Sequence, residues 1–339
     1  MSTYEVALQF EDGVTKFIKV MEGEALSDAA YRQKINIPLD CRDGACGTCR
    51  AFCEEGRYEM DEDNYIEDAL TDEEAQAGYI LACQCIPQSN GVYQIQSTSE
   101  ICKTTVHTYE AIVSSLDKVS DSTFVLQLEL KPEQENLSFL PGQYINLKVP
   151  ETEETRSYSF SSIPGSNLVE FVIRNVPEGL MSSYLESHPE RGTPFEFTGP
   201  YGSFYLRSLT KPALFLAGGT GIAPFLSMLE TLVLSDNEQP VNLVYGVTNE
   251  ADLVGVERLE EIRANHQWFD YRIVVFNATS EGVRQGYVME HIEMEWVNDP
   301  TFDLYLCGPI PMVDSVQKWL KEKGVEPVNF YYERFTPNV

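Results

Sequence analysis

Four cysteines constrain this chain more than any other feature of its sequence. Cys41, Cys46 and Cys49 stand in the segment CRDGACGTC, and Cys83 follows in LACQC. A C-x4-C-x2-C run with a distant fourth cysteine is the spacing of plant-type [2Fe–2S] proteins, where four thiolates hold two irons. Glycines within the segment leave its backbone uncrowded, so three thiolates can approach from one side. We therefore predict a [2Fe–2S] cluster on Cys41, Cys46, Cys49 and Cys83.

Zinc is the main alternative for four cysteines. Zinc ribbons usually show two C-x2-C pairs, whereas this chain has one, and this favours the iron–sulfur cluster. Cys53, Cys85 and Cys102 lie outside the pattern, and we expect them to be small buried hydrophobic residues. The four histidines share no metal-ligand spacing.

The length and charge of the chain limit its number of domains and its possible partners. With 339 residues it is expected to form two or three domains. A net charge of −29 argues against nucleic acid and anionic membranes as partners, because both would repel it. Residues 1–100 carry −13 of this charge, so the first third is the most acidic. That excess is compatible with solubility alone or with a docking surface for a basic partner.

The start of the chain carries no basic segment followed by an apolar run, so no signal peptide is predicted. Apolar runs also stay below the roughly 18 residues that a membrane span needs. We therefore expect a cytoplasmic protein with no membrane contact, in which the cysteines stay reduced.

The first 98 residues are predicted to form one domain, the domain of the cysteine cluster. Apolar and polar residues alternate on both sides of Asp12-Gly13, which predicts a hairpin. A helix is expected near residues 27–34, and Thr71 to Glu74 fit a capping box. Residues 99–106 are expected to form a linker.

Two further domains are predicted after the linker. Residues 107–207 hold short β-rich segments between turns, interrupted by one helix near Met181, which predicts an antiparallel barrel. Residues 208–339 alternate strands and helices, which predicts a doubly wound parallel α/β domain. Its helices are expected from about 224, over 256–267, over 287–295 and over 312–323.

Two segments of the predicted barrel are suited to a flavin. In RSYSFSS, Arg156 offers a fork to a phosphate, Tyr158 a ring to stack on a flavin and Ser159 a hydroxyl near flavin N5. Taken alone, an arginine between two strands is usually a surface residue. GLMSSYL at 179–185 places a glycine and serines at a helix start, where anions bind readily.

Two segments of the third domain are suited to a dinucleotide. AGGTGIAP at 217–224 joins a buried strand to a helix, so backbone and helix N-terminus can approach a phosphate. No Lys-Ser or Lys-Thr follows, which argues against a nucleotide-hydrolysing loop. CGPIPM at 307–312 ends a later strand, at the edge where such sheets bind ligands. By itself, Cys307 is equally compatible with a core position.

In this order, the motifs resemble the ferredoxin-reductase family with a plant-type ferredoxin fused at the N-terminus, over essentially the whole chain. Among its members, the chain is similar to the reductase components of aromatic-ring dioxygenases. The resemblance implies a β-grasp ferredoxin domain, a six-stranded antiparallel FAD-binding barrel and an NADH-binding α/β domain. It also implies three cofactors, which are FAD, a [2Fe–2S] cluster and NADH.

The resemblance further implies roles for single residues. Those of the flavin site are Arg156, Tyr158, Ser159, Val172, Arg174, Gly179, Met181, Ser182 and Ser183. Those of the nucleotide site are Gly218, Gly219, Thr220, Gly221, Gly308 and Pro309. Cys307 is expected beside the nicotinamide, and Glu333 and Phe335 near the flavin. The expected catalytic residues are Ser159, Cys307 and Glu333.

Two features of the sequence bear on the choice of cofactors. NADP-dependent relatives carry basic residues after the second strand of the nucleotide domain. This chain has Glu250 and Asp252 within residues 245–253 and no Arg or Lys there, which favours NADH with Glu250 as a ribose ligand. Relatives that use FMN carry the ferredoxin at the C-terminus, so the domain order favours FAD.

The expected function is therefore to pass electrons from NADH through FAD and the cluster to the Rieske oxygenase of an aromatic-ring dioxygenase. One alternative keeps the enzyme and changes its partner to a toluate- or xylene-type dioxygenase or a di-iron monooxygenase. Another is a non-enzymatic ferredoxin-type carrier or redox sensor with a degenerate reductase half. Intact AGGTGIAP and CGPIPM segments argue against the second alternative.

Overall fold

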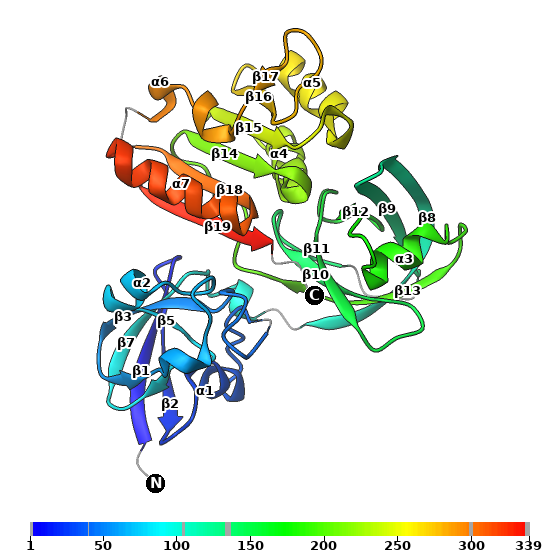
Figure 1. The fold of residues 1–339 in the computed structure, drawn as a ribbon. Helices are drawn as coiled ribbons and strands as arrows, with labels where there is room; N and C mark the ends of the chain where they lie inside the picture. Colours follow the sequence, from blue (N-terminus) through cyan, green and yellow to red (C-terminus); the bar gives the residue numbers. More distant parts are fainter. Residues whose placement is uncertain (1–2, 40, 104–105, 133–136, 298–300, 336–339) are drawn as a thin grey trace. The chain divides into compact units, whose positions relative to one another are not determined.

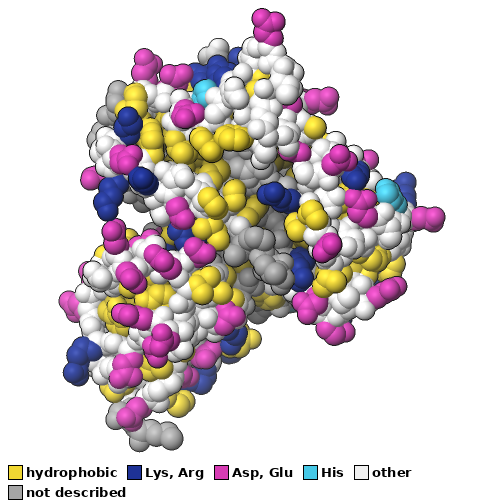
Figure 2. Space-filling model, viewed as in Figure 1, with side chains coloured by type: hydrophobic (Ala, Val, Ile, Leu, Met, Phe, Trp, Pro, Cys, Tyr) yellow, Lys and Arg dark blue, Asp and Glu magenta, His cyan; other side chains and the backbone are white. Residues whose placement is uncertain are grey.

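The computed structural model describes the chain except for residues 1–2, 40, 104–105, 133–136, 298–300 and 336–339. It contains two compact units (Figure 1). The first comprises Met1–Val106 and Tyr201–Ser203, and the second comprises His107–Pro200 and Phe204–Val339. Acidic side chains are spread over the surfaces of both units on the face shown in Figure 2.

The first unit is built on a five-stranded sheet in the order β2-β1-β7-β3-β5. Its strands are β1 (Thr3–Phe10), β2 (Thr15–Met21), β3 (Arg50–Glu55), β5 (Tyr79–Leu81) and β7 (Gly91–Ile95). Strands β1 and β2 form the predicted hairpin, and β1 pairs in parallel with β7. Helix α1 (Leu26–Arg32) buries Leu26, Ala29 and Ala30 in the core of this unit.

Shorter elements complete the first unit. They are β4 (Tyr58–Glu59), β6 (Ile86–Pro87), η1 (Glu62–Asn64), α2 (Asp72–Gln76) and η2 (Ile101–Lys103). The capping box predicted for α2 is confirmed, because Thr71 Oγ1 accepts from the Glu74 N–H and the Glu74 carboxylate accepts from the Thr71 N–H. Helix η2 falls within the expected linker, yet Cys102 is buried in the core. Residues 104–105 of that linker lie outside the described residues.

The second unit begins with a six-stranded antiparallel sheet in the order β11-β10-β13-β8-β9-β12. The strands are β8 (His107–Ser120), β9 (Thr123–Leu130), β10 (Tyr144–Lys148), β11 (Thr155–Ser159), β12 (Leu168–Arg174) and β13 (Pro194–Tyr201), with helix α3 (Leu180–Glu186) before β13. A bridge between Phe160 and Phe171 joins the two edge strands. This bridge closes the sheet into the predicted barrel, and both rings fill its interior.

The rest of the second unit is a parallel six-stranded sheet in the order β17-β16-β15-β14-β18-β19. The strands are β14 (Ala213–Gly218), β15 (Val241–Val247), β16 (Phe269–Val275), β17 (Arg284–Gln285), β18 (Asp303–Pro309) and β19 (Asn329–Phe335). Short helices η3 (Gly219–Ile222) and η4 (Glu250–Asp252) follow β14 and β15. The pairings are parallel, as the strand–helix alternation predicts.

Helices cover both faces of this sheet (Figure 1). Helices α4 (Ala223–Val233) and α5 (Val256–Asn265) pack on one face with Phe215, and α7 (Ile310–Lys323) packs on the other with Leu214 and Leu216. Alternate residues of β14 therefore point to opposite cores, and all six are buried. Among the described residues, no helix has the length and apolar character needed to cross a membrane.

The helix predicted over 287–295 is wrong. This segment forms η5 (Val288–His291) and a short α6 (Met294–Val297). Between them, Ile292 has an extended backbone and a side chain buried in the sheet core. Packing of Ile292 thus overrides the helical periodicity of the segment.

Candidate cofactor sites

The four predicted cluster cysteines lie close together in the first unit. Cys49 lies immediately before β3 and Cys83 just after β5, and these strands are antiparallel neighbours. The Cys49 thiol donates to the Cys83 sulfur at 3.3 Å, and the Cys46 N–H donates to the Cys41 sulfur at 3.4 Å. All four are free thiols, and Cys49 is buried whereas the other three are half-buried.

The backbone of the cysteine loop depends on left-handed residues. Gly44 has φ 81° and Gly47 has φ 69°, a region that favours glycine. A Cβ on Gly44 would lie 2.3 Å from the carbonyl oxygen of Asn64, so a larger residue would displace backbone. The loop is therefore curled by its glycines, and this curl brings Cys41 and Cys49 into contact with Cys83, and Cys46 into contact with Cys41.

The thiols also influence one another electrostatically. Hydrogen bonding with Cys46 and Cys83 lowers the pKa of Cys41, and hydrogen bonding with Cys83 lowers that of Cys49. The same contacts raise the pKa of Cys46 and of Cys83, so each thiol titrates in dependence on its neighbours. A bound metal would require all four as thiolates. Three thiols of a glycine-curled loop and the neighbouring Cys83 thiol match the four-cysteine ligand set of a [2Fe–2S] cluster.

A second site lies in the second unit, where three expected catalytic residues meet. Cys307 on β18 and Glu333 on β19 are paired neighbours in the parallel sheet. Ser159, at the end of barrel strand β11, donates from Oγ to Glu333 Oε2 at 3.2 Å. The Cys307 sulfur lies 4.0 Å from the same carboxylate oxygen. The carboxylate therefore joins two side chains that lie far apart in the sequence.

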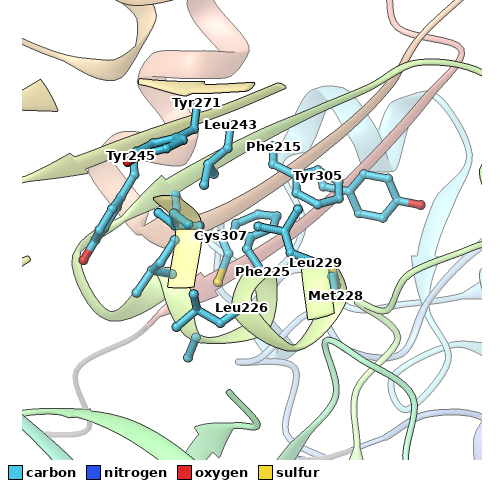
Figure 3. Packing of buried hydrophobic residues seen from close by; sticks show 14 of the residues in the cluster. Phe215, Phe225, Leu226, Met228, Leu229, Leu243, Tyr245, Tyr271, Tyr305 and Cys307 are labelled. Atoms are coloured by element: carbon cyan, nitrogen blue, oxygen red, sulfur yellow. The ribbon is translucent and has the colours of Figure 1, made fainter. Parts of the chain in front are cut away.

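Cys307 is wholly buried among apolar side chains of β14, β15, β18 and α4 (Figure 3). Burial raises the pKa of its thiol well above the ordinary value, and the nearby Glu333 carboxylate raises it further. The thiol is thus neutral at physiological pH, when it can donate weakly to Glu333 but is not a nucleophile.

The glycines of the 217–224 segment are of two kinds. A Cβ on Gly218 would lie 2.4 Å from Met312 Sδ, and a Cβ on Gly221 would lie 2.4 Å from the Cys307 carbonyl oxygen. Both residues are therefore glycines because the 307–312 segment packs on them. Gly219 differs, because it has φ 56° and no atom within 4 Å of an added Cβ. Its open side leaves room for a ligand next to the start of α4.

The packing explains other residues of these motifs as well. Met312 also packs on Gly308, because a Cβ added to Gly308 would lie 2.8 Å from Met312 Sδ. Thr220 is half-buried beside Gly219, and Pro309 is exposed at the start of α7. Met312 was not predicted as a site residue. The sequence feature that could have identified Met312 is its position on the first turn of the helix after Cys307.

The predicted flavin residues of β11 lie on two faces of the strand. Arg156 and Tyr158 share one face, and Ser159 lies on the other, in keeping with strand alternation. The Arg156 guanidinium donates to the Thr155 carbonyl at 2.7 Å, and burial raises the pKa of Tyr158, whose ring packs on the barrel core.

The predicted residues around α3 differ in their exposure. Ser182 is buried, and its Oγ accepts from the Val176 N–H at 2.8 Å. Met181 is buried in the barrel core, whereas Arg174 and Ser183 are exposed. Gly179 caps α3. The exposed members and the backbone of α3 can contact a ligand, while the buried serine holds the turn before the helix.

Val172 and Phe335 complete the set of predicted flavin residues. Val172 is buried in the core shared with Phe225 and Leu226 of α4, so its side chain joins the barrel to the α/β layer. Phe335 is half-buried at the end of β19, two residues after Glu333.

Glu250 has several hydrogen-bond donors in the structure. Its carboxylate accepts from both N–H and hydroxyl groups of Thr279 and Ser280, at 2.5 to 3.1 Å. The Ser280 hydroxyl and then the Thr279 N–H lower the pKa of Glu250 to about 2. A ribose hydroxyl would have to share or replace these donors, so Glu250 orders the loop after β16 in addition to its predicted role.

Comparison with protein families matches three models along the chain. A 2Fe-2S iron-sulfur cluster binding domain matches residues 9–88, an oxidoreductase FAD-binding domain 110–205 and an oxidoreductase NAD-binding domain 215–318. These matches confirm the three predicted cofactors and favour the iron–sulfur cluster over zinc.

Similar proteins span the whole chain. The toluate 1,2-dioxygenase electron transfer component of Pseudomonas putida is 47% identical, over 98% of both chains. The 2-halobenzoate 1,2-dioxygenase electron transfer component of Burkholderia cepacia is 46% identical, over 99% of both. Among solved structures, the Amycolatopsis cytochrome P450 reductase GcoB has a TM-score of 0.71 at 28% identity, covering 98% of this chain and 99% of its own.

Proposed function

This chain belongs to the family of oxygenase electron-transfer components with 2Fe-2S, FAD-binding and NAD-binding domains, and we propose that it is the NADH-dependent reductase of a benzoate 1,2-dioxygenase type of system. When bound, FAD would accept a hydride from NADH and release the two electrons singly to the [2Fe–2S] cluster, a conversion that a nicotinamide does not readily perform. The observation that carries the proposal is the meeting of Ser159, Cys307 and Glu333.

We propose that these three side chains shape the place of hydride transfer. Glu333 orients the Ser159 hydroxyl by accepting its proton in a hydrogen bond, which leaves the Ser159 lone pairs directed elsewhere. Cys307 supplies a small, neutral surface, because burial keeps its thiol protonated. A neutral thiol is a poor nucleophile towards the electrophilic ring of the oxidised product, NAD+, so the site disfavours covalent attack on the nicotinamide after hydride transfer.

The nucleotide is assigned to the carboxyl edge of the parallel sheet. Gly219 has an open side there, and the α4 N-terminus supplies backbone N–H groups suited to a pyrophosphate. The segment 245–253 holds Glu250 and Asp252 and no cation, and this disfavours the extra phosphate of NADPH. NADH is therefore the proposed donor.

The proposed acceptor is a Rieske oxygenase acting on a benzoate-like aromatic acid. The two relatives described above are named for toluate and 2-halobenzoate dioxygenases. Rieske centres lie at least about 250 mV above plant-type clusters. One electron therefore moves downhill by roughly 6 kcal/mol. We place this function in the cytoplasm, where thiols and NADH are maintained in reduced form.

The visible spectrum of the purified protein, recorded during anaerobic NADH titration, tests this function. Overlapping flavin and [2Fe–2S] bands that both bleach at stoichiometric NADH are expected. A colourless protein containing zinc would refute the cofactor assignment. Bleaching of flavin with an oxidised cluster would refute the internal electron path, and reduction of a purified benzoate-type oxygenase would then test the partner.

A further inference from the structure

Arg258, on α5, makes three charged or polar contacts at once. Its Nε donates to Glu230 Oε1 at 2.6 Å, and one terminal nitrogen donates to Glu170 Oε1 at 2.8 Å. The other terminal nitrogen donates to the Ser161 carbonyl at 2.7 Å. No motif of the sequence singles out this arginine. The three contacts use the planar fork of a guanidinium, which a lysine ammonium cannot reproduce.

Two of these contacts lie on the flavin-binding barrel. Ser161 lies two residues after Ser159, and its own hydroxyl donates to Glu170 Oε1 at 2.8 Å. Glu170 on β12 also accepts from the Gln127 amide on β9. Arg258 therefore holds the chain where the barrel closes, directly after the strand that carries the Ser159 hydroxyl.

The other side of the contact lies in the nucleotide-binding layer. Glu230 belongs to α4, the helix that begins directly after the glycine segment 218–221. Arg258 thus joins α5 and α4 to the barrel through a single guanidinium. An apolar contact accompanies it, because Val172 of β12 is buried in the same core as Phe225 and Leu226 of α4.

A second polar contact joins the same two layers. Asp252, in the turn after β15, accepts from the Ser120 hydroxyl at 3.1 Å and the Ser122 hydroxyl at 2.5 Å. Both serines lie at the β8–β9 turn of the barrel. The contacts of Arg258 and Asp252 therefore join the barrel to the nucleotide-binding layer, in addition to the hydrogen bond from Ser159 to Glu333. Of the contacts of Arg258 and Asp252, that of Arg258 lies next to the strand end of Ser159.

We propose that Arg258 is a positioning residue for hydride transfer, which sets the barrel strand carrying Ser159 against the helix that follows the nucleotide-binding glycines. This inference rests on the proposed function. Partly exposed ion pairs contribute little to stability, and Arg258 is 28% exposed. The rate of hydride transfer depends far more strongly on geometry, since a displacement of about 1 Å between reactants can slow a reaction on the order of 100-fold.

The test compares Arg258→Met with a matched variant on the same helix, Arg263→Met. Arg263 pairs with Asp270 within the nucleotide-binding layer and is 51% exposed. In stopped-flow experiments at saturating NADH, we expect Arg258→Met to slow flavin bleaching by about 10- to 100-fold. Arg263→Met is expected to match the wild type, and Arg258→Lys to recover only part of the rate.

A readout independent of turnover is hydrogen exchange of the resting holoenzyme. The Phe160 and Ser161 N–H groups are bonded to Gln143 and Glu170 carbonyls, so they report on the barrel closure directly. We expect faster exchange over residues 160–162 in Arg258→Met and no change in Arg263→Met. Unchanged exchange together with an unchanged bleaching rate would overturn the proposal.

Glu170→Gln provides a second variant in case Arg258→Met does not hold its flavin. It removes one of the two carboxylate charges that face Arg258 while keeping side-chain length, and we expect a smaller slowing in the same direction. A wild-type rate in Glu170→Gln, when Arg258→Met loses flavin, would overturn the positioning role. If wild-type flavin itself is not bleached by NADH, the proposed function fails instead.

Discussion

The cysteine loop and the Ser159–Cys307–Glu333 site are assembled in opposite ways. Three cluster cysteines come from nine consecutive residues, and a single tight loop brings them together. Ser159 and Glu333 are separated by 174 positions and meet only because the end of β11 lies beside β19. A local site thus depends on loop conformation, whereas a non-local site depends on the register and packing of whole sheets.

The two sites also differ in how each residue contributes. In the proposed cluster site each of Cys41, Cys46, Cys49 and Cys83 is a covalent ligand, so the loss of one would remove a quarter of the shell that holds the irons. In the proposed hydride site Ser159, Cys307 and Glu333 act by orientation and electrostatics, where single losses would give graded effects. Substitutions in the loop should therefore act in an all-or-none manner, and substitutions in the hydride site should act by degrees.

Cys49→Ser is expected to give the largest effect. Cys49 is buried beside Cys83, and a serine oxygen is a poor substitute for an iron-bound thiolate. We expect loss of the cluster absorbance and of NADH–cytochrome c reduction, while flavin bleaching by NADH persists.

Cys53→Ser is the control for this loss. Cys53 lies in the same unit, outside the spacing, and its thiol donates to the Glu55 carbonyl, a bond that serine can keep. It should retain the full cluster spectrum. Equal loss of the cluster in Cys49→Ser and Cys53→Ser would mean that substitution disrupts the folded domain, and not that Cys49→Ser removes a ligand.

The difference between a local and a non-local site explains which residues could be predicted from the sequence. Cys41, Cys46, Cys49 and Cys83 follow from spacing alone, as does the capping box at Thr71, because both are local. Cys307 alone was compatible with a core position, and indeed it is buried. Only its pairing with Glu333 on β19, set by sheet register, brings it to the carboxylate.

Other features could not be read from the sequence for related reasons. The contacts of Arg258 join elements up to 97 positions apart, and no periodicity encodes them. The Thr279 and Ser280 donors of Glu250 come from a different strand end. At 287–295 a helical period was overridden by burial of Ile292 in the sheet core. In each case a tertiary contact determines the outcome.

Gly221→Ala is expected to give the next largest effect. Its Cβ would lie 2.4 Å from the Cys307 carbonyl oxygen and 2.8 Å from the carbonyl carbon, so β18 backbone must move. We expect a loss of stability of about 1–3 kcal/mol. Displacement of Cys307 should slow flavin bleaching by up to about 100-fold. Thermal unfolding and stopped-flow absorbance measure both.

Gly219→Ala tests whether Gly219 and Gly221 differ in role, because a methyl group added at position 219 has no atom within 4 Å. Its φ of 56° costs an alanine roughly 1 kcal/mol. The methyl occupies the side assigned to NADH, so KM for NADH should rise while the maximal bleaching rate stays close to wild type. The same slowing as in Gly221→Ala would show that the two glycines do not differ in role.

Cys307→Ala should give an intermediate effect, confined to the hydride site. It removes a buried neutral thiol 4.0 Å from Glu333 and leaves a small cavity. We expect flavin bleaching by NADH to slow by about tenfold, in the range of a lost positioned contact. The cluster spectrum should stay intact. An unchanged rate of hydride transfer would remove Cys307 from the mechanism.

Glu250→Gln should give the smallest effect, because it changes the loop at the nucleotide edge and none of the three hydride-site residues. The amide keeps one acceptor oxygen but weakens the charge-assisted bonds from Thr279 and Ser280. We expect KM for NADH to rise by about threefold, which corresponds to roughly half the free energy of a tenfold change. The matched control is Glu257→Gln, which removes the same charge from an exposed position on α5.

The pH dependence of KM for NADH tests whether the Glu250 carboxylate stays charged in this contact. Because the folded pKa of Glu250 is about 2, below its ordinary 4.5, the contact contributes fully above about pH 4.5 and is lost as the pH falls toward 2. Between pH 5 and 8 the ratio of KM values for Glu250→Gln and wild type should therefore stay constant. A ratio that changes across this range would show that Glu250 titrates there, and its bonds to Thr279 and Ser280 would then not hold the carboxylate in its charged form.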